Sequence, residues 1–130
     1  MKIKSGIELL AETPGDGNVA RKGCRVTYNV RLFLNRGDEV PMDARLLVSG
    51  LPADRIRNTG SGRMVDHQIT LGKRQSIAGI EHTLMGMRAG GYRKVRIAPH
   101  LAYRDAGIPG LIPANAVLVV DVWLRCAEGA

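Results

Sequence analysis

The sequence predicts an α+β fold in which a twisted antiparallel β-sheet wraps around one short α-helix, within a single domain of 130 residues. Apolar and polar side chains alternate along residues 24–34 and along residues 117–125, which is the two-residue period of half-buried strands. Only residues 77–87 repeat apolar side chains at helical spacing. Six strand-like segments and a single short helix favour a sheet that covers the helix.

The first third of the chain predicts three strands. We expect an edge strand over residues 3–10, closed by the turn-rich residues 12–17. Residues 35–38 have the composition of a hairpin turn, and a return strand is expected over residues 40–48, interrupted early by a proline. Within residues 24–34, the inward face is expected to carry Val26, Tyr28, Val30 and Leu32, and the outward face Thr27, Asn29, Arg31 and Phe33.

The middle of the chain predicts a long loop and then the helix. Residues 49–64 are rich in glycine, serine, proline and charge, so we expect a loop insertion there. A strand resumes over residues 65–71. The helix follows, and Gly90 and Gly91 are expected to end it. The residues at helical spacing are Ile77, Ile80, Leu84 and Met87.

Two further strands complete the predicted sheet. Residues 92–98 form the first, and residues 117–125 form the second. Between them, residues 100–114 are expected to form a loop that prolines and glycines stiffen. The inward residues of the two strands are predicted to be Val95, Ile97, Leu118, Val120, Val122 and Leu124.

Composition indicates a globular protein with an ordinary core, because 45% of the residues are hydrophobic. The formal net charge is +7, yet the basic residues are scattered and do not interleave with aromatic residues, which disfavours nucleic-acid binding. No apolar run has the length of a signal peptide or a membrane span. Cys24 and Cys126 are expected to be packed thiols in a reducing compartment, so a cytoplasmic location is predicted.

The sequence offers no metal or cofactor chemistry. His67, His82 and His100 have neither the i, i+4 pairing nor the cysteine partners of metal ligands. No phosphate-binding, dinucleotide-binding or nucleophile motif is present. We therefore expect neither a metal nor a cofactor.

Several segments carry a family resemblance. Four lie in the second half of the chain: LGKRQSIAGIE (71–81), MGMRAGGYRKVRIAP (85–99), LAYRDAGIPGLIP (101–113) and VLVVDV (117–122). Two lie upstream: PGDG (14–17) and KGCRVTYNV (22–30). In this order they resemble the FKBP-type peptidyl-prolyl cis-trans isomerases, the immunophilins, over most of the chain outside residues 35–66. The resemblance implies an FKBP-like fold and rotamase activity on the X–Pro bonds of proline-containing polypeptides during protein folding.

Such an isomerase needs no cofactor. Rotation about an X–Pro bond is slow because amide resonance must be lost, a barrier of roughly 20 kcal/mol. A dry apolar cup can grip the proline, remove water from the amide and hydrogen-bond the twisted backbone, all of which favour the transition state.

The resemblance also assigns roles to individual residues. It implies that the Ile77 backbone N–H and the Tyr103 hydroxyl act as the catalytic donors to substrate carbonyls, and that Ile80 forms the pocket floor. It places the remaining substrate-binding positions at Tyr28, Val40, His67, Ile108, Leu111, Ile112 and Val120.

This chain departs from the family pattern at the pocket. Ile80 stands where the family usually has tryptophan, and Val120 stands where phenylalanine is common. The family's Phe-Asp pair aligns with Val40-Pro41 without a gap, or with residues 42–43 after a shift. These changes imply a wider, shallower cup, so we expect weak isomerase activity and poor binding of macrolide inhibitors.

Other interpretations remain open. The helical spacing and the two tyrosines fit a plain core as well as a site. The same fold fits a non-catalytic protein-binding module. Phe33 and Trp123 are expected on the outer face of the sheet, which suits self-association or a protein partner unless the N-terminal segment or the long loop covers it.

Overall fold

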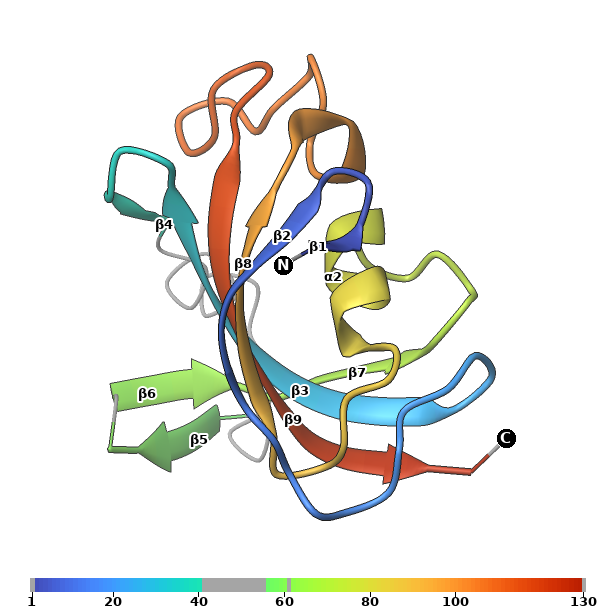
Figure 1. Cartoon of the computed structure of the whole chain (residues 1–130). Helices are drawn as coiled ribbons and strands as arrows, with labels where there is room; N and C mark the ends of the chain where they lie inside the picture. The colour runs from blue at the N-terminus through green and yellow to red at the C-terminus, as the bar shows by residue number, and fades with distance from the viewer. Residues whose placement is uncertain (1, 41–55, 61, 130) are drawn as a thin grey trace.

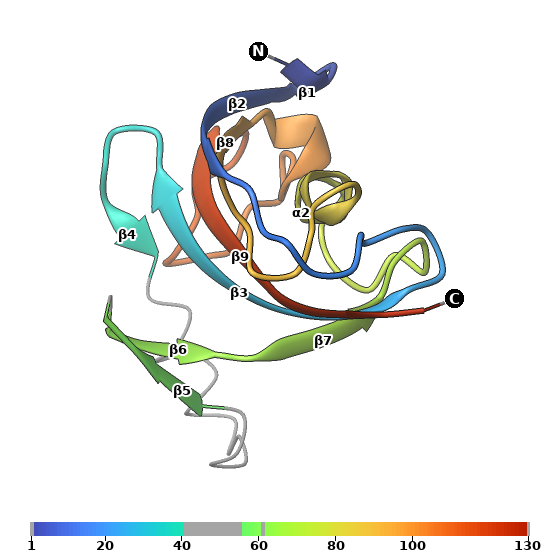
Figure 2. The same cartoon turned by 60° about the horizontal axis from the view of Figure 1, so that its bottom comes forward.

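The computed structural model describes residues 2–40, 56–60 and 62–129, and in it an antiparallel sheet curves around one helix (Figure 1). In sheet order the strands are β1 (Lys2–Lys4), β2 (Ile7–Thr13), β8 (Tyr92–Ile97), β9 (Leu118–Glu128), β3 (Arg25–Leu34) and β4 (Glu39–Val40). The short strand β7 (His67–Thr70) pairs with the first part of β3, on the edge that β4 occupies further along. Figure 2 shows α2 (Ala78–Leu84) inside the concave side of the sheet. The predicted α+β class is confirmed.

The core lies between the concave face of the sheet and α2. Antiparallel register places side chains of β3, β8 and β9 on this face in rows, such as Leu32 beside Val120 and Val120 beside Val95. All the residues predicted to face inward on β8 and β9 are fully buried: Val95, Ile97, Leu118, Val120, Val122 and Leu124. Each such side chain contributes about 1.5–3 kcal/mol through burial.

Close contact with β8 sets the position of α2. Gly79 faces the sheet, where a Cβ atom would lie 2.5 Å from the Ile97 Cγ2 atom and 3.0 Å from the Leu101 carbonyl oxygen. The buried Thr83 hydroxyl donates to the Gly79 carbonyl oxygen at 2.7 Å. The helix ends at Leu84, sooner than expected, because Met85 is already extended with ψ 128°.

Replacing Gly79 with alanine is expected to lower the free energy of unfolding by about 2 kcal/mol, because the helix must move away from Ile97. Helix propensity alone would favour alanine by about 1 kcal/mol. Urea unfolding followed by the fluorescence of Trp123, the single tryptophan, measures the change. Gly60→Ala is the matched control, since nothing lies within 4 Å of its added Cβ. A stability gain in the Gly79 variant would contradict this packing.

The N-terminal prediction needs correction. In place of one edge strand over residues 3–10, the chain forms β1 and β2, which pair with each other across a reversal at Gly6. Gly6 has φ 92°, a conformation that favours glycine, and so permits this turn. Strand β2 is internal, because its other edge pairs with β8.

The predicted long loop is also wrong where the structure describes it. Strands β5 (Ile56–Thr59) and β6 (Gly62–Val65) form a two-stranded hairpin, closed by the pair Thr59 and Gly62. Gly60 and Gly62, which contributed to the loop prediction, lie at the described end of this hairpin. Of the return strand predicted over residues 40–48, only Val40 is described, in β4; residues 41–55 lie outside the described residues.

A polar cluster fastens the hairpin to the outer face of the sheet. Asn29 is fully buried there, and its amide donates to the Val65 carbonyl at 2.8 Å and to the Asp66 carboxylate at 2.7 Å. Arg57 donates to both Asp66 oxygens, and Arg125 donates to the Asn29 Oδ1 atom at 2.6 Å. The hydrogen bond from Arg57 holds the pKa of the Asp66 carboxyl below its usual range, although partial burial acts in the opposite direction.

Candidate functional site

A cavity of about 400 Å³ opens between the concave side of the sheet and the start of α2. Strands β3 and β7 form one wall, the loop over residues 71–77 leads into the helix, and a loop after the 3₁₀ turn η2 (Pro99–Leu101) completes the rim. The lining residues are Tyr28, Val30, Leu32, His67, Gln68, Ile69, Gln75, Ser76, Ile77, Ile80 and Tyr103. None of them is a lysine, an arginine or a carboxylate.

The bottom of this cavity is aliphatic. Ile80 from α2 and Leu32 from β3 are almost fully buried, with 4% and 1% of their surface exposed. Val30 and Ile77 are half-buried, so their side chains still present apolar surface to an incoming group. Gln68 and Gln75 are the exposed lining residues, so the cavity is an apolar cup with a few hydrogen-bonding groups at its edge.

Two aromatic rings form the sheet side of the cup. Tyr28 and His67 are directly opposite each other on β3 and β7, and their rings stack with centroids 5.4 Å apart. Burial raises the pKa of the Tyr28 hydroxyl above its usual value of 10.0, a hydrogen bond with Ser76 lowers it, and the nearby Glu81 and Tyr103 raise it further. The hydroxyl therefore stays protonated around neutral pH.

A buried carboxylate shapes the loop that leads into the helix. Glu81 is 6% exposed, and its two oxygens accept hydrogen bonds from the backbone N–H groups of Gly72, at 2.9 Å, and Ser76, at 3.2 Å. This brace spans the segment that carries Gln75, Ser76 and Ile77 to the cavity. Glu81 is thus a positioning residue, because it acts on the cavity through the backbone.

Ile77 forms the junction between this loop and α2. Its φ is −62° and its ψ is 147°, and its carbonyl accepts hydrogen bonds from the N–H groups of Ile80 and Glu81. Within the described part of the chain, no group accepts a hydrogen bond from the Ile77 N–H. A backbone donor is therefore available at the edge of the apolar cup.

Half of the residues that the sequence assigns to the site line this cavity: Tyr28, His67, Ile77, Ile80 and Tyr103. Tyr103 comes from the loop after η2, where its carbonyl accepts a hydrogen bond from the Gly107 N–H at 3.0 Å. These residues come from four separate segments of the chain.

The other five assigned residues are close to the core without lining the cavity. Val40 and Val120 are buried on either side of Leu32, on β4 and β9. Ile108 and Ile112 pair through two backbone hydrogen bonds of 2.8 Å, and Leu111 lies between them. The role of these five residues in substrate binding stays a prediction.

Six lining residues were not assigned from the sequence: Val30, Leu32, Gln68, Ile69, Gln75 and Ser76. Val30 and Leu32 had a usable signal, because the alternation of β3 places them on the same face as Tyr28. Gln75 and Ser76 had none, because it is the Glu81 brace that holds their loop at the cavity.

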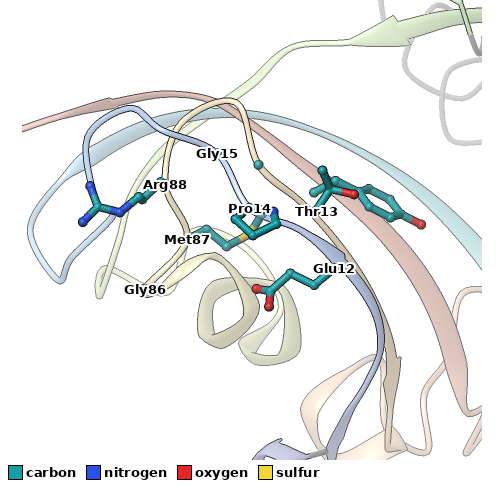
Figure 3. Close-up of a pocket in the computed structure, with 9 residues that line it drawn as sticks. Glu12, Thr13, Pro14, Gly15, Gly86, Met87 and Arg88 are labelled. Atoms are coloured by element: carbon teal, nitrogen blue, oxygen red, sulfur yellow. The ribbon is translucent and has the colours of Figure 1, made fainter.

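A second, smaller hollow of about 170 Å³ lies between the end of β2 and the loop before β8 (Figure 3). Its charged groups are engaged elsewhere: Glu12 pairs with Arg93 at 2.7 Å, and Arg88 donates to the Gly17 carbonyl at 3.3 Å. In Figure 3, Glu12 and Arg88 extend in different directions. We therefore regard this hollow as a packing gap and the larger cavity as the candidate site.

Residues 2–40, 56–60 and 62–129 contain no group of histidine, cysteine and carboxylate side chains that could hold a metal ion. In the same ranges, no helix is long and apolar enough to cross a membrane. Cys24 and Cys126 are both free thiols, the first buried and the second half-buried.

Longer relatives contain a match to nearly the whole chain. FK506-binding protein 4 of Chaetomium thermophilum is 48% identical over 124 residues, which is 95% of this chain and 22% of that protein. FK506-binding protein 4 of Gibberella zeae is 49% identical over 124 residues, which is 95% of this chain and 21% of that protein. The chain thus spans about a fifth of the length of these two relatives.

A relative of similar length and a family model point to the same family. FK506-binding protein 1A of Neurospora crassa is 38% identical over 95 residues, which is 72% of this chain and 76% of that protein. The family model described as FKBP-type peptidyl-prolyl cis-trans isomerase matches residues 17–125. The match covers most of the chain and all the elements around the cavity, so this chain belongs to the FKBP-type peptidyl-prolyl cis-trans isomerases.

Proposed function

We propose that this isomerase binds the proline of a polypeptide substrate in the cavity between β3, β7 and α2 and rotates the X–Pro bond there. The proposal is supported chiefly by one juxtaposition: the available Ile77 N–H stands beside an aliphatic cup formed by Ile80, Val30 and Leu32. A proline ring is apolar and carries no N–H, so it fits a cup without charged lining residues.

The mechanism requires no covalent step and no proton transfer. The cup removes water from the X–Pro amide, which destabilises the planar, polar resonance form relative to the twisted form. The Ile77 N–H donates to one substrate carbonyl and the Tyr103 hydroxyl donates to another, holding the chain on both sides of the rotating bond. Tyr28 supports the wall with its ring stacked on His67.

We also propose that this chain catalyses X–Pro rotation only weakly and that it binds macrolide inhibitors poorly. The floor is the aliphatic Ile80, and the buried Val120 lies beside Leu32 without lining the cavity, so the cup lacks an aromatic floor. A tryptophan floor would offer the proline ring a larger contact area than an isoleucine does, so an aliphatic floor forgoes part of that contact. FK506-binding protein 1A of Neurospora crassa is the natural reference for both quantities.

NMR exchange between the cis and trans forms of a short X–Pro peptide tests the function. We expect the folded protein to accelerate exchange, less than the Neurospora protein does. Tyr103→Phe should lower kcat/KM about fivefold, the equivalent of one hydrogen bond worth about 1 kcal/mol. Tyr92→Phe is the matched control, because that hydroxyl donates to Asp121 at 2.6 Å on the outer face of the sheet.

Each outcome of this experiment has a definite meaning. If a demonstrably folded protein gave no acceleration, the isomerase proposal would fail. Equal losses in the two tyrosine variants would remove Tyr103 from the mechanism. A rate equal to that of the Neurospora protein would overturn the proposed weakness.

A protein-binding role of the outer face is the second candidate. Phe33 and Trp123 both lie on that face and remain partly exposed, and the Trp123 ring contacts the Tyr92 ring with centroids 5.3 Å apart. The row of Arg31, Asp121 and Lys94 separates the two aromatic positions. Light scattering over a concentration series tests self-association, and a constant monomer mass would exclude it.

We further propose a cytoplasmic role in protein folding. Both cysteines are free thiols, which suits a reducing compartment. Recovery of the protein with a secretory-pathway marker in cell fractionation would contradict this location. Failure to accelerate the refolding of a protein limited by proline isomerisation would contradict the folding role.

A further inference from the structure

Two sets of basic residues differ in their charge partners. Five arginines form ion pairs with carboxylates: Arg31, Arg36, Arg57, Arg93 and Arg96. Six exposed basic residues at one end of the molecule form no ion pair with any described residue: Arg21, Lys22, Arg25, Lys73, Arg74 and Arg88. We call these six residues the basic end.

Backbone contacts bring the basic end together from three segments. The Gly23 N–H donates to the Leu71 carbonyl at 2.9 Å, and a Cβ on Gly72 would lie 2.8 Å from the Lys22 Cγ atom. Residues 21–25 therefore lie beside residues 71–74. The Ala20 N–H donates to the Met87 carbonyl at 2.8 Å, which adds Arg88 to the same end.

Few carboxylates offset this charge. Asp16 lines an open hollow of about 650 Å³ together with Arg21, Lys22 and Arg88. Glu128 is opposite Arg25 in the β3–β9 register. The buried Glu81 carboxylate also lies at the loop that carries Lys73 and Arg74. Six basic side chains against these three acidic ones leave a surplus of three positive charges among them, which attracts anionic groups.

The basic end adjoins the rim of the prolyl cavity. The Arg25 guanidinium donates to the Gln68 Oε1 atom at 3.3 Å, and Gln68 lines the cavity. Lys73 and Arg74 directly precede Gln75, whose side chain also lines the cavity and accepts a hydrogen bond from the Thr70 N–H at 2.7 Å. A chain that leaves the cavity past Gln68 and Gln75 therefore meets Arg25, Lys73 and Arg74 next.

We propose that the basic end extends the substrate site and selects X–Pro segments with acidic residues on one side of the proline. This inference rests on the proposed function of the cavity. An acidic polypeptide fits better than a nucleic acid, because the adjoining cavity has an aliphatic bottom and no charged lining residue. In addition, none of the six residues is aromatic, whereas single-stranded nucleic acids are held by stacking on aromatic rings.

Three series of peptides test the proposal. They share one central X–Pro pair and carry three glutamates, three glutamines or three lysines, either before or after it. At low salt we expect kcat/KM to be about fivefold higher with glutamate than with glutamine in one of the two placements, from a few exposed ion pairs. In about 1 M salt, where the Debye length is about 3 Å, the preference should disappear.

Paired variants locate the preference. Lys73→Gln with Arg74→Gln should bring the glutamate-to-glutamine ratio close to one. Lys4→Gln with Lys94→Gln removes the same formal charge from β1 and from the outer face of the sheet, and should keep the ratio. Because the readout is a ratio within each variant, a general loss of activity does not mimic the effect.

The failures are distinguishable. If no peptide is rotated, the proposed function of the cavity fails. If all three series are rotated at one rate, or if the Lys73/Arg74 variant keeps the preference, the inference fails while the function stands. It also fails if single-stranded RNA binds with a steep salt dependence and the acidic peptides gain no advantage.

Discussion

Replacing Ile77 with proline is expected to lower kcat/KM for X–Pro rotation about tenfold while leaving the fold intact. Proline lacks the backbone N–H, so the substrate carbonyl loses its donor at this position. Loss of one well-placed hydrogen bond of about 1.4 kcal/mol corresponds to a tenfold change in rate. The NMR exchange assay gives kcat and KM separately, and urea unfolding confirms that the variant is folded.

The backbone at this position already suits proline. Ile77 has φ −62°, close to the angle that the pyrrolidine ring imposes, and its ψ of 147° is extended. Its N–H bonds to no described residue, so no native hydrogen bond is lost. Its carbonyl still accepts hydrogen bonds from the N–H groups of Ile80 and Glu81, so the first turn of α2 keeps its backbone hydrogen bonds.

The control separates the N–H from the side chain. Ile77→Ala keeps the donor and removes most of the apolar surface that Ile77 presents to the cavity, for an expected loss of about threefold. If the proline and alanine variants lost equal activity, the side chain alone would matter and the N–H would have no part in catalysis. An unfolded proline variant would contradict the structure of this junction.

Local patterns were sufficient for the strands that build the core. In β8 and β9 the period of two alone identified the inward face, because both strands are long, paired on both edges and covered by α2 on one side. The end of the helix was harder to predict from the sequence. Met87 fits the helical spacing and is buried. It lies, however, in a segment that is not helical and that pairs with residues 19–20.

Features that depend on distant partners could not be read from local patterns. Asn29 has the sequence position of an outward-facing polar residue, yet it is fully buried. Its amide is satisfied by Val65 and Asp66, which are more than thirty residues away in the chain. No pattern near Asn29 or in residues 56–65 indicates that contact, so the sequence predicts a loop where the structure has a hairpin.

The candidate site shows the same division. No local signal connects Tyr28, His67, Ile80 and Tyr103, and they were grouped only because their order resembles one family. The structure brings them together at one cavity. The polar rim at Gln75 and Ser76 was not foreseen, because it depends on how a buried carboxylate holds the preceding loop.

Replacing Glu81 with alanine is expected to lower the free energy of unfolding by about 3 kcal/mol and to raise KM for the peptide. The carboxylate is buried, and its loss removes two hydrogen bonds to a charged group, from the N–H groups of Gly72 and Ser76, each worth about 1.5–3 kcal/mol. The loop that holds Gln75 and Ile77 at the cavity would then lose its brace.

A positioning role and a purely structural role predict different kinetics. If Glu81 only stabilises the fold, kcat and KM of the folded variant stay unchanged below the unfolding transition. If it positions the loop, KM rises while the protein remains folded, and amide hydrogen exchange accelerates at residues 72–77 before it does in β9. Glu81→Gln should recover part of both losses, because an amide oxygen can accept one of the two hydrogen bonds. An alanine variant with unchanged KM and unchanged exchange in this loop would reduce Glu81 to an ordinary core residue, and the geometry of the cavity would then have to be maintained by the apolar contacts of Ile77 and Ile80 alone.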